Sequence, residues 1–282
     1  MNYFTHEIIN ERLVRIKDLT TTACYLALGD KKTCLVDTCG GCGSLRDYVR
    51  DNFHKEVDLV ILSHSHLDHA GGIYEFQDLP IYMNHEDIVL GNRDNTRKRR
   101  SDMFAREGSV DDPDLIMPNI DFNITIPLND KDVLDLGGLS LEAIHTPGHT
   151  HGMTMILFRE LRTILFGDGC GVGVLIYNDD STSIEEYLES LLKVKEREDD
   201  YDYIIRNHGT CCSEKDLLDN VIECCRDILD GNDDHADVYD ALPEGMEDVY
   251  YARAIDPISH NRLDGKFGNI AYSPKKIHKQ DS

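Results

Sequence analysis

The chain of 282 residues carries 53 acidic and 29 basic side chains, which give a formal net charge of −24, and 40% of its residues are hydrophobic. This length and apolar fraction are ordinary for one large globular domain with a full core. The negative charge opposes binding to nucleic-acid phosphates and anionic membrane surfaces, so we expect no nucleic acid and no membrane among its partners. The N-terminal residues show no basic segment followed by an apolar one, and nine cysteines without an export signal are typical of reduced thiols, so we expect a cytoplasmic protein.

The first 37 residues show three strand patterns. Residues 12–16, 23–28 and 33–36 are rich in apolar and β-branched side chains, and Gly29-Asp30-Lys31 suits the turn of a hairpin between the last two. Asp37 directly follows the third strand. The pattern predicts the beginning of an antiparallel sheet.

A glycine-rich segment, Cys39-Gly40-Gly41-Cys42, comes next. Two cysteines at this spacing can form a redox pair or half of a zinc site, but the sequence contains no second such pair to complete a four-cysteine site. We therefore interpret the segment as a loop, and leave open a metal-tuning or oxidation-sensitive role. Ser44 is then a suitable N-cap for a helix over residues 45–53, whose apolar side chains recur at helical spacing.

The densest cluster of metal-ligand side chains follows the apolar run at residues 60–62, which has the composition of a buried strand. Four such side chains fall within six residues: His64, His66, Asp68 and His69. Side chains two apart in an extended segment point the same way, so His64 and His66 can face one ion. The helical pattern of two histidines four residues apart is absent. We predict a metal-binding loop, residues 63–72, at the end of a strand.

Residues 93–106 form the basic run of this acidic chain, with six Arg or Lys side chains. We interpret it as a solvated helix face whose charges pair with nearby acids. An anion-recognising lid over the site is the alternative. Three prolines between residues 111 and 127 predict an irregular loop of a length that often covers a site. His85, before this region, is expected to begin a helix rather than to bind metal.

The following segments predict a second sheet. Residues 133–136 and 139–144 form a hairpin pattern around two glycines, and residues 153–158 and 163–166 read as two more strands. An amphipathic helix is predicted over residues 183–197.

The last part of the chain begins with a predicted strand over residues 201–205. A helix capped by Ser213 and running to about residue 229 follows. We predict a main domain over residues 1–230 and a C-terminal extension, residues 231–282, packed on the same domain. The extension either walls the pocket or mediates formation of a homodimer.

Three isolated metal-ligand side chains lie further along the chain than the first cluster: His149, Asp168 and His208. Each follows an apolar strand pattern and lies beside or one residue from a glycine, which lets the backbone turn and approach a site closely. Strand ends are where ligand sites collect in layered α/β proteins. Any one of the three alone is as well explained as a surface polar group, but together with the first cluster they predict one metal centre.

This set of residues resembles the metallo-β-lactamase superfamily, in its glyoxalase II- and lactonase-like branch. The resemblance rests on His64-x-His66-x-Asp68-His69 followed by His149, Asp168 and His208, and covers roughly residues 20 to 210. It implies an α/β protein with a four-layer αββα sandwich and two metal ions at one edge. His64, His66 and His149 would bind one metal, Asp68, His69 and His208 the other, and Asp168 would bridge them. Asp37 would support the metal loop by holding a ligand or its backbone.

The chemistry that this resemblance implies is hydrolysis by a hydroxide that bridges two divalent metal ions about 3.5–4 Å apart. Imidazole and carboxylate ligands suit zinc, with iron or manganese as alternatives. Asp68 is the expected catalytic residue, as proton acceptor or orienter of the hydroxide. Cys170 could line the site. The leaving-group acid cannot be named from the sequence.

The expected substrate is a small thioester, ester or lactone. Gly171 stands where quorum-signal lactonases have a tyrosine, and residues 169–173 differ from the usual glyoxalase II continuation, so the substrate stays open. An oxidoreductase similar to persulfide dioxygenases, with a single iron held by His64, His149 and Asp168, is the alternative. A non-catalytic metal-binding protein is a third possibility, which the complete ligand set disfavours.

Overall fold

The computed structural model describes residues 3–107, 110, 112–238 and 248–279. The first of its sheets has seven strands, of which the first four pair antiparallel and the last four pair parallel. In spatial order they are β1 (Thr5–Asn10), β2 (Leu13–Lys17), β3 (Ala23–Leu28), β4 (Thr33–Val36), β5 (Leu59–Ile61), β6 (Ile81–Met83) and β7 (Ile126–Pro127).

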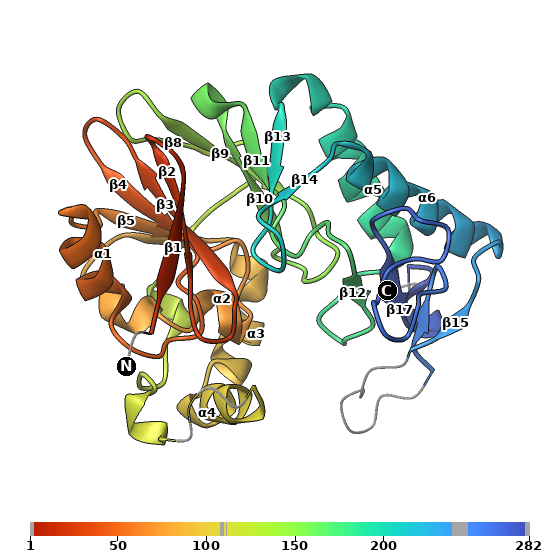
Figure 1. Ribbon diagram of the computed structural model, residues 1–282, viewed down its shortest axis with the longest axis horizontal. Coiled ribbons are helices and arrows are strands. Elements are labelled where there is room, and N and C mark those ends of the chain that lie inside the picture. Colours follow the sequence, from red (N-terminus) through yellow and green to blue (C-terminus); the bar gives the residue numbers. More distant parts are fainter. Residues whose placement is uncertain (1–2, 108–109, 111, 239–247, 280–282) are drawn as a thin grey trace.

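The second sheet has six strands and lies beside the first in Figure 1. Its spatial order is β14 (Cys212–Ser213), β13 (Tyr203–Ile205), β11 (Thr163–Leu165), β10 (Thr154–Phe158), β9 (Ser140–His145) and β8 (Val133–Asp135). The predicted hairpin is the pair β8 and β9, whose register joins Asp135 to Ser140.

Alternation along the strands explains how the two sheets pack. On β3, Tyr25 and Ala27 point into a core shared by the two sheets, whereas Cys24 and Leu26 point into a core on the outer side. On β10, Ile156 and Phe158 enter the shared core and their neighbours enter the opposite outer core. A strand that is buried on both faces must be apolar at successive positions, which is the pattern read in the sequence.

Helices cover both outer faces. Leu45 and Val49 of α1 (Leu45–Phe53) pack in the outer core of the first sheet. Side chains of α5 (Ile184–Lys195) and α6 (Asp216–Asp230) pack in the outer core of the second sheet. In Figure 1 the order from left to right is α1, the two sheets, then α5 and α6. The expected four-layer αββα sandwich is confirmed.

Local sequence signals set most helix starts. Ser44 caps α1 by accepting from the Asp47 backbone N–H, and Ser183 caps α5 in a capping box with Glu186. The predicted helix near residues 213–229 is present as α6, but its predicted cap was wrong: the helix begins at Asp216, because Ser213 lies in β14, where it pairs with Ile204 of β13.

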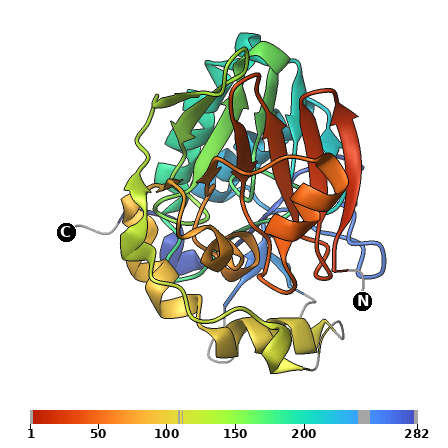
Figure 2. The same cartoon turned by 90° about the vertical axis from the view of Figure 1, so that its left-hand side faces the viewer.

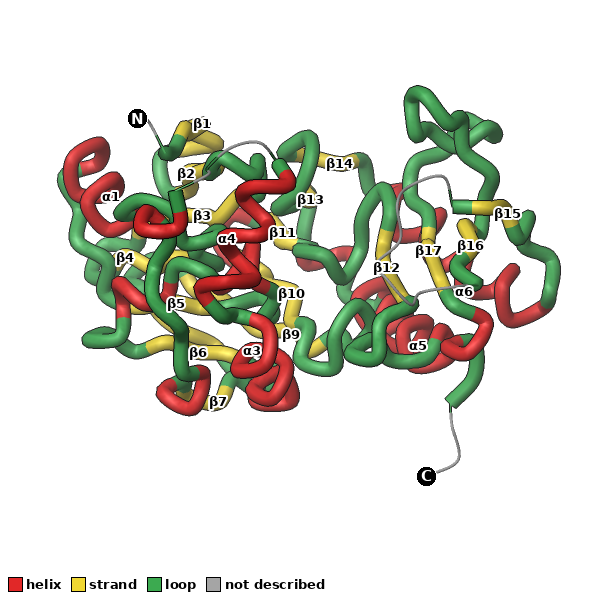
Figure 3. Tube along the Cα trace, turned by 90° about the horizontal axis from the view of Figure 1, so that it is seen from below, coloured by secondary structure: helices red, strands yellow, loops and turns green. Residues whose placement is uncertain are grey.

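The segment between β6 and β7 of the first sheet holds α3 (Ile88–Asp94) and α4 (Arg97–Arg106), together with the short 3-10 helices η2 (His85–Asp87), η3 (Pro113–Leu115) and η4 (Phe122–Ile124). α4 lies at the lower edge of the molecule in Figures 1 and 2 and faces the viewer in Figure 3. Arg97 pairs with Asp114 and Lys98 with Asp102, as expected of a solvated helix face. Arg100 differs, because it is fully buried and its guanidinium donates to the backbone carbonyls of Gly71, Met117 and Pro118.

A third sheet has four strands, in the order β12 (Val174–Ile176), β17 (Ile270–Tyr272), β16 (Tyr250–Tyr251) and β15 (Ala236–Asp237). It therefore joins the predicted extension to a strand of the main domain (Figure 3). Residues 239–247 and 280–282 of that extension lie outside the described residues, and the domain division stays a prediction. The remaining 3-10 helices are η1 (Ile73–Phe76), η5 (Arg159–Leu161), η6 (Glu198–Asp200) and η7 (Pro274–Lys276). Within the described part of the chain, no helix has the length and apolarity that crossing a membrane requires.

Candidate metal centre

The predicted ligands meet because the strands before them end at one edge. β4 and β5 are parallel, so Asp37 and the metal loop leave the first sheet on the same side. In the second sheet, β9 and β11 both pair antiparallel with β10, and β13 pairs parallel with β11, so these three strands run in one direction. Their carboxyl ends lead to His149, Asp168 and His208. All seven predicted ligands come together in three overlapping groups.

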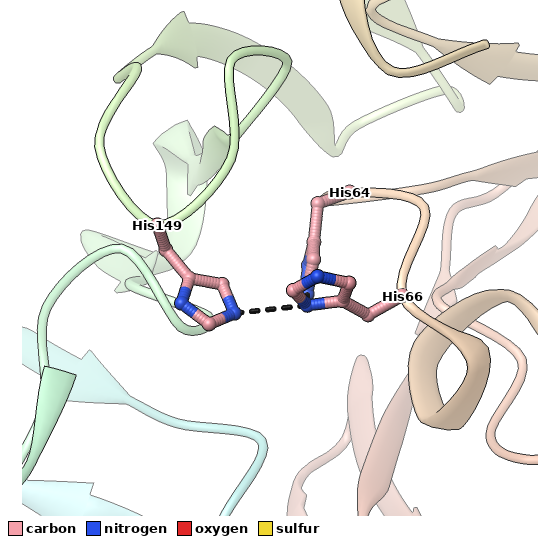
Figure 4. A group of neighbouring side chains, drawn as sticks. All are labelled: His64, His66 and His149. Carbon is pink, nitrogen blue, oxygen red and sulfur yellow. Dashed lines mark hydrogen bonds between the residues drawn. The ribbon is translucent and has the colours of Figure 1, made fainter. Parts of the chain in front are cut away.

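The first group consists of His64, His66 and His149, whose rings converge (Figure 4). Nδ1 of His66 lies 3.1 Å from Nε2 of His64 and 2.9 Å from Nε2 of His149. His64 and His66 come from the loop after β5, and His149 from the loop after β9, so the group joins the two sheets. We call these residues the first ligand group.

The second ligand group consists of Asp68, His69 and His208. The Nε2 atoms of His69 and His208 are 3.1 Å apart, and Oδ2 of Asp68 lies 3.5 and 3.4 Å from them. Asp168 lies between the groups: its carboxylate oxygens are 3.4 Å from Nε2 of His208, 3.5 Å from that of His69 and 3.6 Å from that of His149. This is the arrangement expected of a bridging carboxylate.

The hydrogen bonds behind the rings decide which nitrogen atoms carry lone pairs. Nδ1 of His149 lies 3.0 Å from the carbonyl oxygen of Leu175, and Nδ1 of His69 lies 3.0 Å from the Asp37 carboxylate, so both Nδ1 atoms must be donors. Ser63 donates its hydroxyl proton to Asp37, so its oxygen accepts from Nδ1 of His64. When these rings are neutral, their three Nε2 atoms direct lone pairs into the site. Lone pairs and carboxylates at such separations repel unless a cation lies among them, so this donor set fits divalent metal ions.

Asp68 and His69 lie on a short helix, α2 (Leu67–Ala70), and not on the extended loop that the sequence predicted. The helix turns their side chains from the first ligand group toward the second, while His66 stays extended at φ −62° and ψ 151° as its N-cap. Thr22 donates to Oδ2 of Asp68 at 3.3 Å. The glycines after the helix allow close packing, because a Cβ on Gly71 would lie 2.3 Å from the Gly40 carbonyl oxygen.

Asp37 is fully buried and connects the two sheets beneath the site. Its carboxylate accepts from the backbone N–H of Ser63 at 2.7 Å, from His69 and from the side chain of Asn207 at 2.9 Å. Its backbone has a positive φ of 63°, which Asp tolerates better than most residues. The supporting position predicted for Asp37 is where the structure places it.

Sequence reasoning missed a second buried carboxylate, Asp87, at the end of η2. It accepts from the backbone N–H groups of Ser65 and Gly152, at 3.2 and 2.7 Å, and from the Thr150 hydroxyl at 2.8 Å. It thus ties the loop of His64 and His66 to the loop of His149. No local signal distinguishes Asp87 from an ordinary acidic residue at a helix start.

The two ligand groups differ in their electrostatics. Burial, followed by repulsion from neighbouring imidazoles, lowers the pKa of His64 and lowers that of His66 to about 3. Asp168 raises the pKa of His208 to about 10. Burial opposes protonation of His69, but the carboxylates of Asp168 and Asp68 outweigh it and raise its pKa. A cation in the second group would therefore replace protons, whereas His64 and His66 of the first group bind no proton at neutral pH.

Other candidate residues lie outside these groups. Cys170 is buried in the outer core of the second sheet and joins none of the metal-ligand groups. Cys39 and Cys42 are free and buried, in two different apolar clusters. His85 is exposed and contacts the Thr125 carbonyl oxygen at 3.1 Å, in agreement with its predicted place at a helix start.

A cavity of about 650 Å³ opens onto the ligands, which is large enough for a small organic substrate. His66, Asp68, His149, Asp168 and His208 form its floor, and Arg206, Val172, Asn178, Asn261 and Phe267 are among its walls. Asn261 and Phe267 belong to the C-terminal extension, so that segment does wall the pocket. The basic run contributes no residue to the lining.

A family model described as the metallo-beta-lactamase superfamily matches residues 18–205. The chain belongs to this superfamily. The matched residues include β3 to β7 of the first sheet, β8 to β11 and β13 of the second, and every predicted ligand except His208, which lies three residues beyond the match.

Several curated members of the superfamily are similar in sequence. An acyl-coenzyme A thioesterase, MBLAC2, from Gallus gallus is 26% identical over 191 residues, covering 61% of this chain and 66% of that protein. The metallo-beta-lactamase fold-containing protein ST1585 from Sulfurisphaera tokodaii is 26% identical over 183 residues, covering 59% of this chain and 65% of that protein. The aligned part of this chain thus spans just under two thirds of the length of each relative.

The fold is shared with solved structures at lower identity. A metallo-beta-lactamase from Pontibacter korlensis superposes with a TM-score of 0.58 and 13% identity, covering 79% of this chain and 99% of that chain. This likeness shows the common superfamily fold.

Proposed function

We propose that this superfamily member is a hydrolase that uses two divalent metal ions, with zinc as the first candidate, to cleave a small acyl thioester. The observation that carries the proposal is the convergence of all seven ligand side chains, five of which line the floor of a cavity. Two cations in such a site supply a hydroxide nucleophile at neutral pH and polarise a carbonyl oxygen. The named thioesterase relative is consistent with the substrate class.

Some side chains of the site would bind the metal ions and others hold the ligand loops in place. His64, His66 and His149 would hold one cation, and Asp68, His69 and His208 the other, with Asp168 shared between them. Asp37 and Asp87 hold the loops in place through buried hydrogen bonds. Because these supports are preformed, little reorganisation is required when substrate binds.

Asp68 is the residue best placed to handle the proton of the attacking water. Its Oδ2 faces the second ligand group and accepts a hydrogen bond from Thr22, which fixes the carboxylate. A carboxylate that borders the reaction volume can accept a proton from the nucleophile and orient it. Thr22 is therefore a positioning residue for Asp68.

The cavity lining favours a thioester over an ester or lactone. Apart from the predicted ligands, Arg206 is the one ionisable side chain among the described residues of this lining, and an arginine cannot serve as an acid near neutral pH. An alkoxide leaving group needs a proton, whereas a thiolate, whose conjugate thiol has a pKa of about 8.5, can depart without one. A site without a separate general acid thus suits a sulfur leaving group.

The test is a hydrolysis screen with zinc-loaded protein. Thioesters, oxygen esters and lactones with the same acyl chain are compared, and we expect the thioester to have the highest kcat/KM. Removal of metal by a chelator and the substitution His66→Ala should each lower kcat by at least about 1000-fold, since each removes the charge stabilisation that the cations supply. His151→Ala is the matched control, because His151 lies on the surface two residues from His149.

Two results would contradict the proposal. One is thioester hydrolysis that survives both chelation and His66→Ala. The other is a single iron per chain with oxygen consumption and no hydrolysis, which would favour the persulfide dioxygenase-like alternative. Cytoplasmic location and dimer formation stay predictions, to be checked by fractionation and by light scattering.

A further inference from the structure

Arg206 is a buried cation beside the candidate site that has no anionic partner. It follows β13 and precedes His208 by two residues. Its side chain is 8% exposed, and its Nη2 donates to the Thr210 hydroxyl at 2.6 Å. Its Nε has no hydrogen-bond partner among the described residues, and it forms no ion pair with any described Asp or Glu side chain. Arg15 and Arg100 are also buried without an ion pair to a described acidic side chain, but each donates to two or three backbone carbonyl oxygens, whereas Arg206 donates to one hydroxyl.

The guanidinium lies where the floor of the cavity meets a second hollow. Arg206 lines the cavity of about 650 Å³ and also an adjoining one of about 200 Å³. A Cβ built on Gly209 would lie 3.9 Å from Nη1 and 4.0 Å from Nη2 of Arg206. The two terminal nitrogens of the guanidinium therefore lie beside Gly209, the residue that follows His208. Glu214 and Asp216 line the second hollow but do not pair with it.

Arg15, a second buried arginine near the loop of His208, differs from Arg206 in its contacts. It is also buried, at 3% exposed, but its Nη2 donates to the carbonyl oxygens of Asn207 and Gly209 at 3.4 and 2.9 Å, and it does not line the cavity. Arg15 therefore holds the loop of His208 from behind. Arg206 lines the cavity instead, where an anion would supply its guanidinium with a charged partner.

The walls near Arg206 also include exposed apolar side chains. Val172 and Phe267 line both hollows and are 37% and 59% exposed. Side chains of this kind contact the apolar part of a ligand whose charged group is bound by the guanidinium. The cavity thus combines a reactive floor, one cationic side and an apolar rim.

We propose that Arg206 is a specificity-determining residue that binds a carboxylate or phosphate group of the substrate, while Val172 and Phe267 contact its apolar part. This inference rests on the proposed hydrolase function and adds the substrate class, an anionic acyl thioester. The anion belongs either to the acyl side, as a second carboxylate, or to the thiol side, as a phosphate. The two sources make the same contact with a guanidinium and are separated by the experiment.

The experiment compares kcat/KM for three thioesters in the zinc-loaded full chain. Succinyl- and butyryl-N-acetylcysteamine differ by a carboxylate on the acyl side, and butyryl-coenzyme A and butyryl-N-acetylcysteamine differ by phosphates on the thiol side. We expect Arg206→Gln to lower one of these two selectivity ratios by about 10- to 100-fold, the size of a charge-assisted hydrogen bond. Arg206→Lys, which keeps the charge and loses the fork, should retain part of that ratio.

Arg15→Gln is the matched control, because it removes a buried guanidinium that does not face the cavity. Arg15→Gln should lower kcat/KM for all three thioesters by a similar factor and leave both selectivity ratios unchanged. Metal content is measured for each variant, since Arg206 and Arg15 both adjoin the loop of His208. Both ratios unchanged within about threefold in Arg206→Gln would overturn the proposal.

A binding measurement separates this proposal from the proposed function. Calorimetry with succinate and with desulfo-coenzyme A, which has no thiol for a metal, is done on the wild type and on Arg206→Gln. Weaker binding of one probe to the variant, by at least about tenfold, supports the role of Arg206 even if no thioester is hydrolysed. Equal binding of both probes overturns it, whatever the hydrolysis screen gives.

Discussion

The two ligand groups of the candidate metal centre are built from similar side chains but differ in burial and in charge. In the first group His64 and His149 are buried and His66 is half-buried. In the second, His69 is fully buried, whereas 44% of the His208 side chain and 26% of that of Asp68 are exposed. The first group contains three imidazoles and no carboxylate of its own, and the second contains two imidazoles and a carboxylate.

This difference indicates how one site would bind two cations with unequal affinity. The first group is tied by hydrogen bonds to Ser63 and the Leu175 carbonyl, and its His64 and His66 bind no proton at neutral pH. The second lies at the open side, where solvent and protons compete for its ligands. We therefore expect a first cation that is retained firmly and a second that is released more readily.

Loss of the shared carboxylate should have the largest effect. Asp168→Ala removes the group that contacts ligands of both sets, so both cations should be weakened together. We expect kcat for thioester hydrolysis to fall at least about 1000-fold, because the charge stabilisation supplied by the cations is lost. Steady-state kinetics with metal analysis checks this. Full occupancy of both ligand groups by metal in this variant would contradict the account, because Asp168 would then not be shared between them.

Acidification should separate the two groups. The pKa of His208 is raised to about 10 and that of His69 is raised as well, so below pH 10 a cation entering the second group must displace protons. Its affinity should fall about tenfold for each proton displaced when the pH is lowered by one unit, or about 100-fold from pH 8 to pH 6 for one proton.

The first cation should depend less on pH in this range, because burial lowers the pKa of His64 and lowers that of His66 to about 3, so neither ligand binds a proton there. Competition with a colorimetric zinc chelator at pH 6, 7 and 8 measures both affinities. Equal pH slopes for the two cations would contradict the account.

Asp37→Asn should weaken the second group more than the first. Asp37 contacts His69 directly at 3.0 Å but reaches His64 only through the Ser63 hydroxyl. Asn tolerates the positive φ at this position and keeps the shape while removing the charge. We expect metal affinity of the second group to fall about 10- to 100-fold. A larger loss in the first group, measured by the same chelator titration, would show that Ser63 is the more important contact.

Asp87→Ala should lower the free energy of unfolding and loosen the loops that carry the first ligand group. Three donors from two loops would lose their common acceptor, and leaving buried donors unsatisfied costs about 1–3 kcal/mol. Thermal unfolding of the metal-free protein should show a lower Tm, with the second group affected less than the first in metal binding. An unchanged Tm would indicate that the loops of His64 and His149 are held by other contacts.

Local patterns in the sequence predicted the strands and the convergence of the seven candidate ligands, whereas the four-layer order was implied by the resemblance to the superfamily. Apolar runs buried on both faces identify strands such as β10 and β11, and metal-ligand side chains beside glycines mark where those strands end. By contrast, β1 is mostly exposed and has little apolar patterning, so it is held by its pairing with β2 and was not predicted.

The parts of the site that were missed depend on contacts between distant segments. Asp87 acts on Thr150 and Gly152, which lie 63 and 65 residues away. Arg206 is distinguished by what it does not contact, which no sequence pattern records. The helix α2 places Asp68 and His69, and its short length gave no periodic signal.

The central claim is that the two ligand groups bind two cations with unequal strength. The most direct measurement is the metal-to-protein ratio by elemental analysis, taken as a chelator is titrated at pH 7 into the wild type, His149→Ala and His208→Ala. We expect two metals per wild-type chain, released in two steps, with His208→Ala retaining the firmly held one and His149→Ala losing it. A wild type that saturates at one metal per chain, or a His208→Ala variant that binds as much metal as the wild type, would contradict the account.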